Sequence, residues 1–457
     1  MRTIVEAAEQ LRARKVSSRE LVEESLRRIE DLNPKFNAFI TVTADAALKR
    51  AAVCDEELAS GRDRGPLHGI PIALKDNFFT KGVLTTGGSK LFANHVPDYD
   101  SAVGEKLNEA GAVVVGKTGL HELAYGVSSN NVHYGTIRNP HNPDRIPGGS
   151  SGGSGVAVQT GMVFMAMGSD TGGSVRIPAA YCGTVGLKPT FGRVSRHGMF
   201  PLGYSLDTAG PLTRTCQDAV LSLNAISGFD SRDASCSVRP AENIRLEEPL
   251  HIKDLRVGYA EKFFFERIDP AVGESVKHVL RQLEELGAKV VEVKTPDIEA
   301  VNIAGRIILL AEASAWLEPY HMNRRTEIGP EVLALLDQGR MVSGVEYVNA
   351  QRARRVLQRE FARIWKTVDV LVTPTIPIGA PPIGATTVHV GGLEEDLRGA
   401  TTRFVRPINV LGLPALSVPC GLTGEDLPVG AQVVGPAFGE RRVLTAGAAI
   451  EHCWVIR

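Results

Sequence analysis

Two short clusters of serine and glycine predict tight turns at two neighbouring places in this chain. The first is PGGSSGGSG at residues 147–155, and the second is GSDTGGSVRIP at residues 168–178. Glycine allows a backbone to turn sharply and lets N–H groups approach a ligand closely. A serine beside such a turn is a candidate nucleophile. The two candidates, Ser150 and Ser174, are 24 residues apart in the sequence.

A lysine in an apolar run lies 75 residues before the first candidate serine. It is Lys75, the last residue of GIPIALK at residues 69–75. A single lysine is usually a solvated surface charge. Its apolar neighbours favour a desolvated site here, and desolvation would let the amine lose its proton and act as a base. The lysine and the serines together predict a hydrolase that uses neither a histidine nor a metal.

The composition is that of an ordinary soluble globular protein. The 457 residues are 43% hydrophobic and 23% charged, with a net charge of −1. No excess of positive charge favours nucleic acid or an anionic membrane as the main partner. The six cysteines lack metal-ligand spacing, which predicts reduced thiols. The charged N-terminus and the lack of an apolar stretch of about 20 residues predict a cytoplasmic location.

The N-terminal segment, residues 1–60, has the pattern of helices. Ser17 and Glu20 form an S-x-x-E capping box before an apolar pattern with helical spacing. We expect Pro34 to end that helix and residues 44–58 to form the next one.

The rest of the chain predicts an α/β protein. Residues 66–220, the expected catalytic core, alternate short apolar runs with glycine turns and helical segments. Residues 235–365 are a variable, partly helical segment, and residues 366–457 supply closing strands and a helix, with a loop expected over 375–400. Strands are predicted over residues 69–74, 112–115, 164–167, 255–260, 288–293, 368–372, 415–418 and 429–434. No repeat or low-complexity linker divides the chain, so we expect one domain over residues 1–457.

Two segments match known motifs but lack the secondary structure that those motifs require. GAVVVGKT at residues 111–118 fits the nucleotide-binding P-loop, but its middle residues have the pattern of a strand rather than of a phosphate-binding loop. GSSGG at residues 149–153 fits the nucleophile elbow of α/β-hydrolases, but the preceding residues 139–145 contain two prolines and cannot be the strand that an elbow needs.

The lysine segment and the two clusters resemble the amidase signature family, and both spacings match the pattern of that family. Residues 116–124 and 186–195 are similar to further family segments. The resemblance is dense over residues 66–220, recognisable at both ends and weak over 235–365. It implies an α/β fold in a single domain, with a large mixed, mostly parallel twisted sheet flanked by helices on both faces.

The resemblance also implies roles for individual residues. Ser174 would be the nucleophile, and Ser150 would relay its proton to Lys75, which burial must keep neutral. The peptide bond between Gly149 and Ser150 is expected to be cis. The oxyanion hole would consist of the backbone N–H groups of Thr171, Gly172 and Gly173, with Ser174. The supporting residues would be Gly149, Ser151, Asp170 and Arg176. No cofactor and no metal are implied.

The reaction implied is hydrolysis of an amide C–N bond through an acyl-enzyme. The sequence SVRIP at residues 174–178, and the segment at residues 328–332, are more similar to stand-alone amidases. We therefore expect activity on small aryl or alkyl amides, and carbamates (urethanes) or esters could react by the same chemistry. The expected substrate pocket contains Tyr125, Gly126, Ile177, Met199 and Phe200.

Three alternatives differ in the partners that they imply. A stand-alone enzyme would act on a small-molecule amide or carbamate as a monomer or homodimer, without nucleic acid or membrane. The A subunit of a glutamyl-tRNA(Gln) amidotransferase would use the same catalytic parts within a complex. A non-catalytic scaffold disagrees with the three catalytic positions, all of which are intact.

Overall fold

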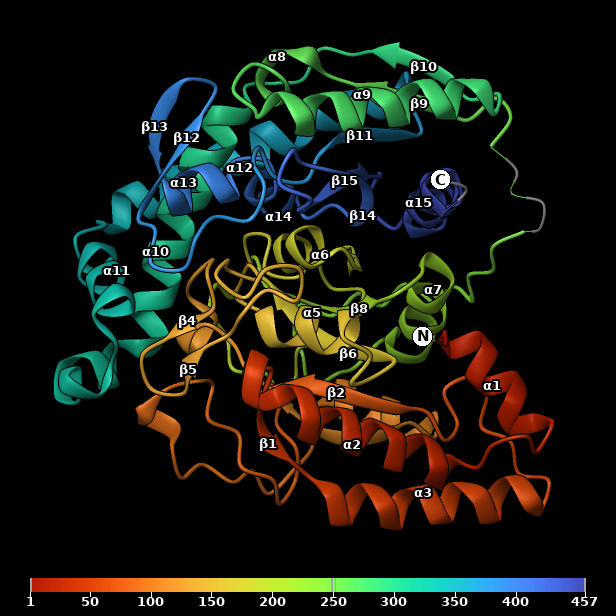
Figure 1. Cartoon of the computed structure of the whole chain (residues 1–457). Coiled ribbons are helices and arrows are strands. Elements are labelled where there is room, and N and C mark those ends of the chain that lie inside the picture. Colours follow the sequence, from red (N-terminus) through yellow and green to blue (C-terminus); the bar gives the residue numbers. More distant parts are fainter. Residues whose placement is uncertain (1, 248–249, 251, 456–457) are drawn as a thin grey trace.

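A computed structural model describes residues 2–247, 250 and 252–455, and one long β-sheet runs through it (Figure 1). In spatial order, the strands of this sheet are β1 (Phe39–Val42), β3 (Val113–Thr118), β2 (Pro71–Lys75), β6 (Met165–Asp170), β8 (Thr208–Thr213), β7 (Val185–Lys188), β14 (Ala415–Leu422), β15 (Pro428–Val434), β11 (Val370–Pro374), β9 (Arg256–Tyr259) and β10 (Lys289–Glu292). Strands from the first half of the chain meet the later strands where β7 pairs with β14.

The mixed α/β architecture confirms the expected fold class, although the sheet is less parallel than expected. Within the described residues, β2–β3, β2–β6, β9–β11 and β9–β10 are parallel, and the other six neighbouring pairs are antiparallel. The short connection between β14 and β15 explains part of this difference, because a hairpin can join only antiparallel strands.

The helices of the described residues include several that pack against the sheet along its length. They are α1 (Ile4–Arg12), α2 (Ser18–Phe36), α3 (Ala44–Ala59), α4 (Ala102–Glu109), α5 (Gly152–Gln159), α6 (Arg176–Cys182), α7 (Cys216–Ile226), α8 (Glu261–Phe264), α9 (Pro270–Glu285), α10 (Ile298–Asn323), α11 (Pro330–Arg340), α12 (Gly344–Phe361), α13 (Leu397–Thr402), α14 (Arg406–Leu411) and α15 (Glu440–Val455). All eight predicted strands are present, with ends shifted by a few residues.

The start of α2 matches the sequence prediction, but its end does not. The Ser17 hydroxyl accepts a hydrogen bond from the Glu20 N–H, and the Glu20 carboxylate accepts one from the Ser17 N–H, as a capping box requires. Pro34 lies inside the helix rather than at its end. The helix stops after Phe36, because Asn37 has a left-handed backbone with φ of 55°.

Two later segments also differ from the sequence prediction. The expected loop at residues 375–400 contains a hairpin, β12 (Thr387–Val390) with β13 (Leu393–Asp396), and the start of α13. The sequence predicts a loop there because proline and glycine surround the hairpin and its alternation of apolar and polar residues is short. The variable segment at residues 235–365 supplies β9 and β10, so it extends the edge of the main sheet and is not only a helical cover.

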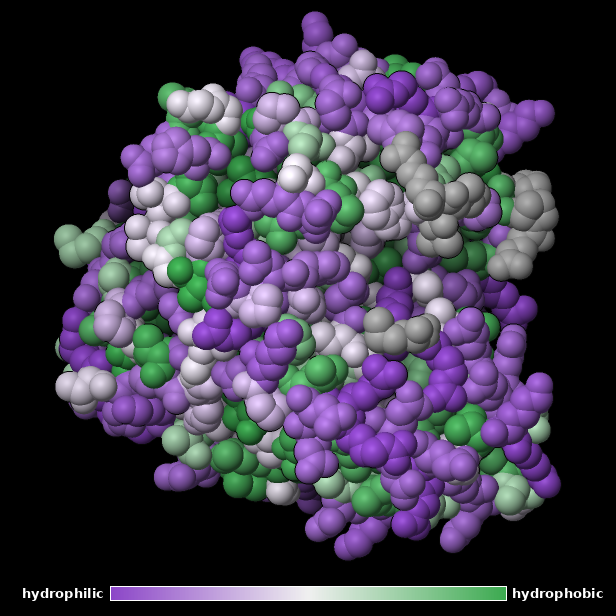
Figure 2. Space-filling model, viewed as in Figure 1, coloured by the Kyte–Doolittle hydropathy of each residue, from purple (hydrophilic) through white to green (hydrophobic). Residues whose placement is uncertain are grey.

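Helix α10 is long and apolar enough to span a membrane by length and composition, which the sequence analysis did not expect. Half of its most apolar window is buried, and it packs against α11, α12 and α14. A core helix passes the same test of length and composition. The face of the molecule in Figure 2 is mostly hydrophilic, with apolar side chains in small, separate groups.

Candidate active site

The lysine and the serine clusters lie together because two parallel strands end side by side. Lys75 is the last residue of β2, which pairs in parallel with β6, with Leu74 opposite Met167. Ser169 follows two residues later in β6, near the same end. Parallel strands carry their carboxyl ends to one edge, so these side chains reach the same space.

The Lys75 ammonium nitrogen is fully buried and touches three hydroxyl groups. Its Nζ lies 2.7 Å from Ser150 Oγ, 2.9 Å from Ser151 Oγ and 2.8 Å from Ser169 Oγ. Burial lowers the pKa of Lys75 to about 7, although the charges of Asp170 and Asp207 act in the opposite direction. Near neutral pH the amine is therefore divided between its charged and neutral forms.

The hydrogen bonds around Lys75 accommodate both protonation states. Ser151 Oγ donates to the Ser169 carbonyl at 3.2 Å, so it accepts from Lys75. Ser169 Oγ accepts a second hydrogen bond, from Asn77 Nδ2 at 3.0 Å. A neutral lysine can donate to these two hydroxyls and use its lone pair to accept the Ser150 proton. The arrangement makes Ser150 the hydroxyl through which a proton can reach Lys75.

Ser174 lies directly beside the Ser150–Ser151 pair. Its carbonyl accepts a hydrogen bond from the Ser151 N–H at 3.2 Å. The peptide bond between Gly149 and Ser150 is cis, as the resemblance implies. Ser174 is buried, with 8% of its surface exposed, in a turn after β6.

The turn before Ser174 presents backbone N–H groups, although one of them is already used. The Gly173 N–H donates to Asp170 Oδ1 at 2.8 Å, which differs from its expected oxyanion role. In the part of the chain that the structure describes, the N–H groups of Gly172 and Ser174 have no acceptor. Gly173 has a φ of 120°, a conformation that favours glycine. Among the described residues the Thr171 N–H has no acceptor either, so Thr171, Gly172 and Ser174 are the candidates for an oxyanion hole.

A buried ion pair holds this turn against α6. Arg176 donates to both Asp170 oxygens, from Nη2 at 2.9 Å and from Nε at 3.0 Å. Burial by itself would raise the pKa of Asp170, but the Arg176 charge and hydrogen bonds lower it below its ordinary value. Arg176 also reaches Gln432 Oε1 and Asn409 Oδ1, both at 2.6 Å. Asp170 and Arg176 thus fix the turn to the C-terminal half of the sheet.

Four of the five expected pocket residues belong to three apolar clusters, and the pocket stays a prediction. Tyr125 and Phe200 share an apolar cluster, whereas Met199 and Ile177 each belong to a different one. Ile177 lies against the turn, since a Cβ built on Gly173 would come within 2.9 Å of its Cδ1. A Cβ built on Gly126 would strike the His121 ring. Phe200 borders a cavity of about 590 Å³ lined by Phe79, Lys90, Leu91, Phe92, Ala93, Asn94, His95, Trp316, Tyr320 and Arg324.

Sequence reasoning missed two polar neighbours of the site. Ser169 lies within the second cluster and was given no role, yet it contacts Lys75. Asp207 is buried and accepts hydrogen bonds from Thr171 Oγ1 at 2.5 Å and from the Leu202 N–H at 2.9 Å. The position of Ser169 in a strand next to the lysine strand was the available signal, but it requires the strand pairing to be known.

The P-loop-like segment has a structural role, in agreement with its rejection. Its middle residues form β3. Lys117 Nζ lies 3.3 Å from Asp76, and it donates to the Phe78 carbonyl at 2.8 Å and to Thr85 Oγ1 at 2.7 Å. This buried lysine therefore braces the loop that follows Lys75.

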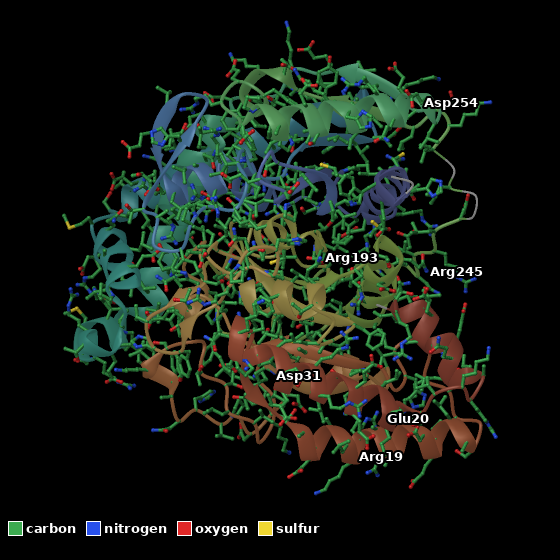
Figure 3. The ribbon with its side chains drawn as sticks, in the orientation of Figure 1. Arg19, Glu20, Asp31, Arg193, Arg245 and Asp254 are labelled. Atoms are coloured by element: carbon green, nitrogen blue, oxygen red, sulfur yellow. The ribbon has the colours of Figure 1, made fainter. Side chains whose placement is uncertain are left out.

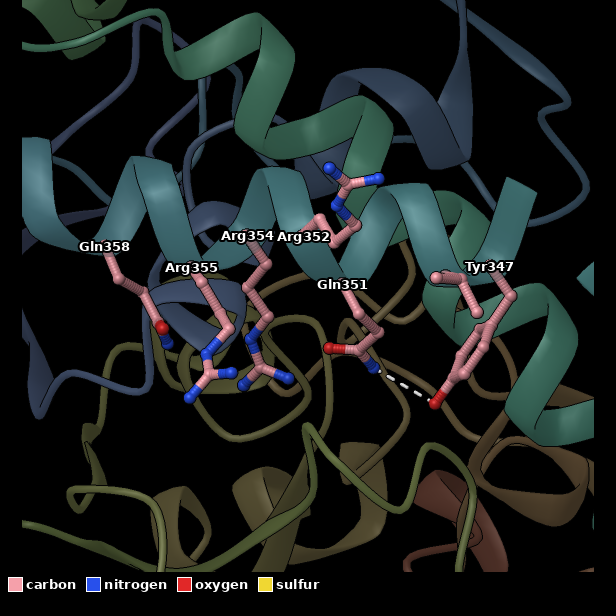
Figure 4. A pocket seen from close by; sticks show the side chains of 7 residues that line it. Tyr347, Gln351, Arg352, Arg354, Arg355 and Gln358 are labelled. Atoms are coloured by element: carbon pink, nitrogen blue, oxygen red, sulfur yellow. Dashed lines mark hydrogen bonds between the residues drawn. The ribbon is translucent and has the colours of Figure 1, made fainter. Parts of the chain in front are cut away.

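An ion pair and a second cavity belong to parts of the molecule outside the candidate active site. Arg193, labelled near the middle of Figure 3, is buried and pairs with Glu440 at 3.0 Å, whereas Arg19 and Asp31 lie on α2. A cavity of about 510 Å³ lies along α12 (Figure 4) and is lined by Tyr347, Val348, Gln351, Arg352, Arg354, Arg355 and Gln358. Gln351 donates to Tyr347 there at 3.0 Å. Among the described residues, no three His, Cys, Asp or Glu side chains are grouped to hold a metal ion.

Comparisons with known proteins cover nearly the whole chain. The family model "Amidase" matches residues 20–444. The A subunit of the Prochlorococcus marinus glutamyl-tRNA(Gln) amidotransferase is 39% identical over 97% of this chain and 95% of the relative. A solved chain from a vestigial protein complex, reported for the origins of an s-triazine catabolic enzyme, is 33% identical and has a TM-score of 0.95, with 99% and 98% of the chains covered. The A subunit of the Thermotoga maritima amidotransferase is 35% identical, with a TM-score of 0.81 over 98% and 94% of the chains.

These relatives correct two expectations. A stand-alone hydrolase of small aryl or alkyl amides, carbamates or esters was expected, and this is wrong, because the matched curated relatives are amidotransferase A subunits. The expected partners, a small molecule without nucleic acid and at most a second copy, are wrong for the same reason, since the relatives are subunits of an enzyme named for its tRNA. The expectations were wrong because the same acyl-transfer site occurs in enzymes with different substrates. Its motifs therefore do not show which of these enzymes a chain is.

Proposed function

Because this chain belongs to the amidase family, whose model spans most of its length, we propose that it is the A subunit of a glutamyl-tRNA(Gln) amidotransferase. It is a hydrolase of carbon–nitrogen bonds, and its substrate in this proposal is the side-chain amide of glutamine. The observation that carries the proposal is the similarity to such subunits over 97% of the chain, well beyond the catalytic motifs.

In the first half of the proposed reaction, Ser174 Oγ attacks the amide carbon of glutamine. Its proton passes through Ser150 to the neutral amine of Lys75. The negative oxygen of the tetrahedral intermediate accepts hydrogen bonds from the N–H groups of Gly172 and Ser174. The C–N bond then breaks, the nitrogen takes the proton back along the same relay, and ammonia leaves an acylated Ser174.

In the second half, water attacks the ester of the acyl-enzyme and gives its proton to the same relay. The products are glutamate and the regenerated Ser174. The ammonia is the nitrogen that the amidotransferase adds to the glutamyl group on tRNA, so partner subunits supply the tRNA-binding and acceptor functions. Aminoacyl-tRNA is made in the cytoplasm, and the cytoplasmic location remains a prediction.

The proposal is tested with the complex that the chain forms in its own host. The tagged chain is purified with its partners and given glutamine labelled with ¹⁵N in the amide. We expect labelled ammonia in solution and label in glutaminyl-tRNA when glutamyl-tRNA(Gln) is present. Ser174→Ala should abolish both signals, whereas Ser60→Ala, at an exposed serine, should keep them.

The result that would overturn the proposal is an assembled complex that leaves glutamine unchanged. Purification of the chain with no partner, with glutamine still unreactive, would overturn it as well.

A further inference from the structure

Three arginine side chains from the C-terminal half lie near the catalytic turn without carboxylate partners. They are Arg306 in α10, Arg398 in α13 and Arg406 at the start of α14. In the described ranges, no Asp or Glu oxygen lies within 4.0 Å of their guanidinium nitrogens. Arg403, between two of them in the sequence, does have such a partner, because its Nη1 lies 3.0 Å from Glu395. We call Arg306, Arg398 and Arg406 the arginine cluster.

Arg406 extends along the turn that carries the oxyanion donors. A Cβ built on Gly172 would lie 3.8 Å from Arg406 Cγ and 3.9 Å from its Nε. On the other side, a Cβ built on Gly305 would lie 3.4 Å from Arg406 Cδ. The side chain is thus held between α10 and the turn that ends at Ser174, with glycines leaving space on both sides.

The Arg406 guanidinium does not use all of its hydrogen-bond donors. Its Nε is shielded from solvent and has no hydrogen-bond partner, while Nη2 donates to Thr402 Oγ1. Burial, followed by the charges of Arg398 and Arg306, lowers the pKa of Arg406 to about 10. The Arg406 guanidinium is partly shielded from water and has no counterion, so a bound anion would stabilise it.

The other two arginines of the cluster, Arg398 and Arg306, make contacts of their own. The Arg398 guanidinium lies 4.8 Å from the centre of the Tyr125 ring, and its Nη2 donates to the Tyr125 carbonyl at 3.0 Å. Arg306 is exposed and donates to Gln338 at 3.3 Å. Thr402 links Arg398 to Arg406, because its Oγ1 donates to the Arg398 carbonyl at 2.8 Å and accepts from Arg406 Nη2. Arg306 follows Gly305, which faces the Arg406 side chain.

We infer that Arg306, Arg398 and Arg406 bind a carboxylate in the acyl part of the substrate whose amide carbon reaches Ser174. The preferred substrates are then half-amides of dicarboxylic acids. Guanidinium groups bind carboxylates in a bidentate way, with specificity for geometry as well as charge. The inference rests on the proposed amide hydrolysis and deepens it, because glutamine is the amino-acid member of this class.

Two substrates of equal reactivity test the inference. Glutaramate carries an amide and a carboxylate, and butyramide carries the amide alone. We expect the purified complex to have a higher kcat/KM for glutaramate, and Arg406→Gln and Arg398→Gln to reduce this preference by about tenfold or more, through KM. Arg352→Gln, at an exposed arginine of α12, is the control and should keep the preference. Equal preferences in the parent and the cluster variants would overturn the inference.

A binding measurement separates this inference from the proposed function. Ser174→Ala cannot turn over substrate, so calorimetry with glutarate reports recognition alone. We expect glutarate to bind, and the double variant Ser174→Ala with Arg406→Gln to bind it at least about tenfold more weakly. Unchanged binding would overturn the inference even if glutamine is hydrolysed, and weaker binding would support it even if glutamine is not. Arg406→Lys, which keeps the charge, shows whether a failure comes from misfolding, and its melting temperature is measured alongside.

Discussion

At the scale of single residues, the reaction depends on whether Lys75 holds a proton. Burial lowers its pKa to about 7, so the neutral form predominates above that pH and the charged form below it. Only the neutral form can accept the proton that arrives through Ser150. We therefore expect kcat/KM for glutamine to rise with pH, with a midpoint near 7, and then to level off.

This prediction is checked by a pH–rate profile of the purified complex. Lys75→Met should remove most of the activity, whereas Lys49→Met, on the N-terminal helix α3, should not. A rise in rate centred near pH 10, the ordinary range for lysine, would contradict the proposed state of Lys75.

The residues of the catalytic relay could be predicted from the sequence, but their surroundings could not. Lys75, Ser150 and Ser174 lie in dense motifs, and the contact between Lys75 and Ser150 agrees with them. Arg398 and Arg406 carry no motif, and an arginine is usually a surface charge. The position of Arg406 near Gly172 depends on a segment more than 200 residues away returning to the turn, which only the folded chain reveals.

At the scale of secondary-structure elements, the pair of Asp170 and Arg176 joins β6 to α6. Both side chains are fully buried. Arg176→Gln would leave the Asp170 carboxylate buried without its partner, and breaking such a pair costs about 3–5 kcal/mol of the free energy of unfolding. We expect a clear loss of stability and of activity, measured by urea unfolding and by glutamine hydrolysis.

The control for this prediction is an ion pair on the surface. Arg19 pairs with Glu23 one turn along α2, with both side chains largely in solvent. Arg19→Gln should change the urea midpoint very little, because water screens exposed pairs. If the two variants were equally stable, Asp170 and Arg176 would not hold the turn.

Elements with a strong apolar pattern could be predicted, and elements set by distant contacts could not. The apolar runs behind β2, β3 and β6 identified those strands to within a few residues. The sequence predicts a helix end at Pro34, because proline lacks an N–H, but Asn37 ends the helix instead. The order of strands in the sheet, and thus its many antiparallel pairs, depends on pairing between residues far apart in the sequence.

At the scale of the whole molecule, the catalytic relay and the arginine cluster come from different halves of the chain. Lys75, Ser150 and Ser174 belong to the first half of the chain, and the arginine cluster belongs to the second. The acyl-transfer residues are common to the family, so their motifs could not distinguish a stand-alone enzyme from one component of a complex. The similarity to the amidotransferase A subunits covers 97% of this chain, so the second half contributes to it as well.

The strand pairing that joins the halves predicts that they unfold together. Leu416 is fully buried in β14, opposite Leu187 in β7 on one side and Val433 in β15 on the other. Leu416→Ala removes contacts from both halves, which costs about 2–5 kcal/mol. We expect one calorimetric transition, moved to a lower temperature, with activity lost in step.

Leu422→Ala is the matched control, since that leucine lies at the exposed end of the same strand. It should leave the melting temperature nearly unchanged. A second transition, unmoved by Leu416→Ala, would mean that the halves are separate folding units and would contradict the single domain expected over residues 1–457. One shared transition would instead show that the two halves unfold cooperatively. The arginine cluster and the catalytic turn would then be lost together, because neither half could stay folded after the other had unfolded.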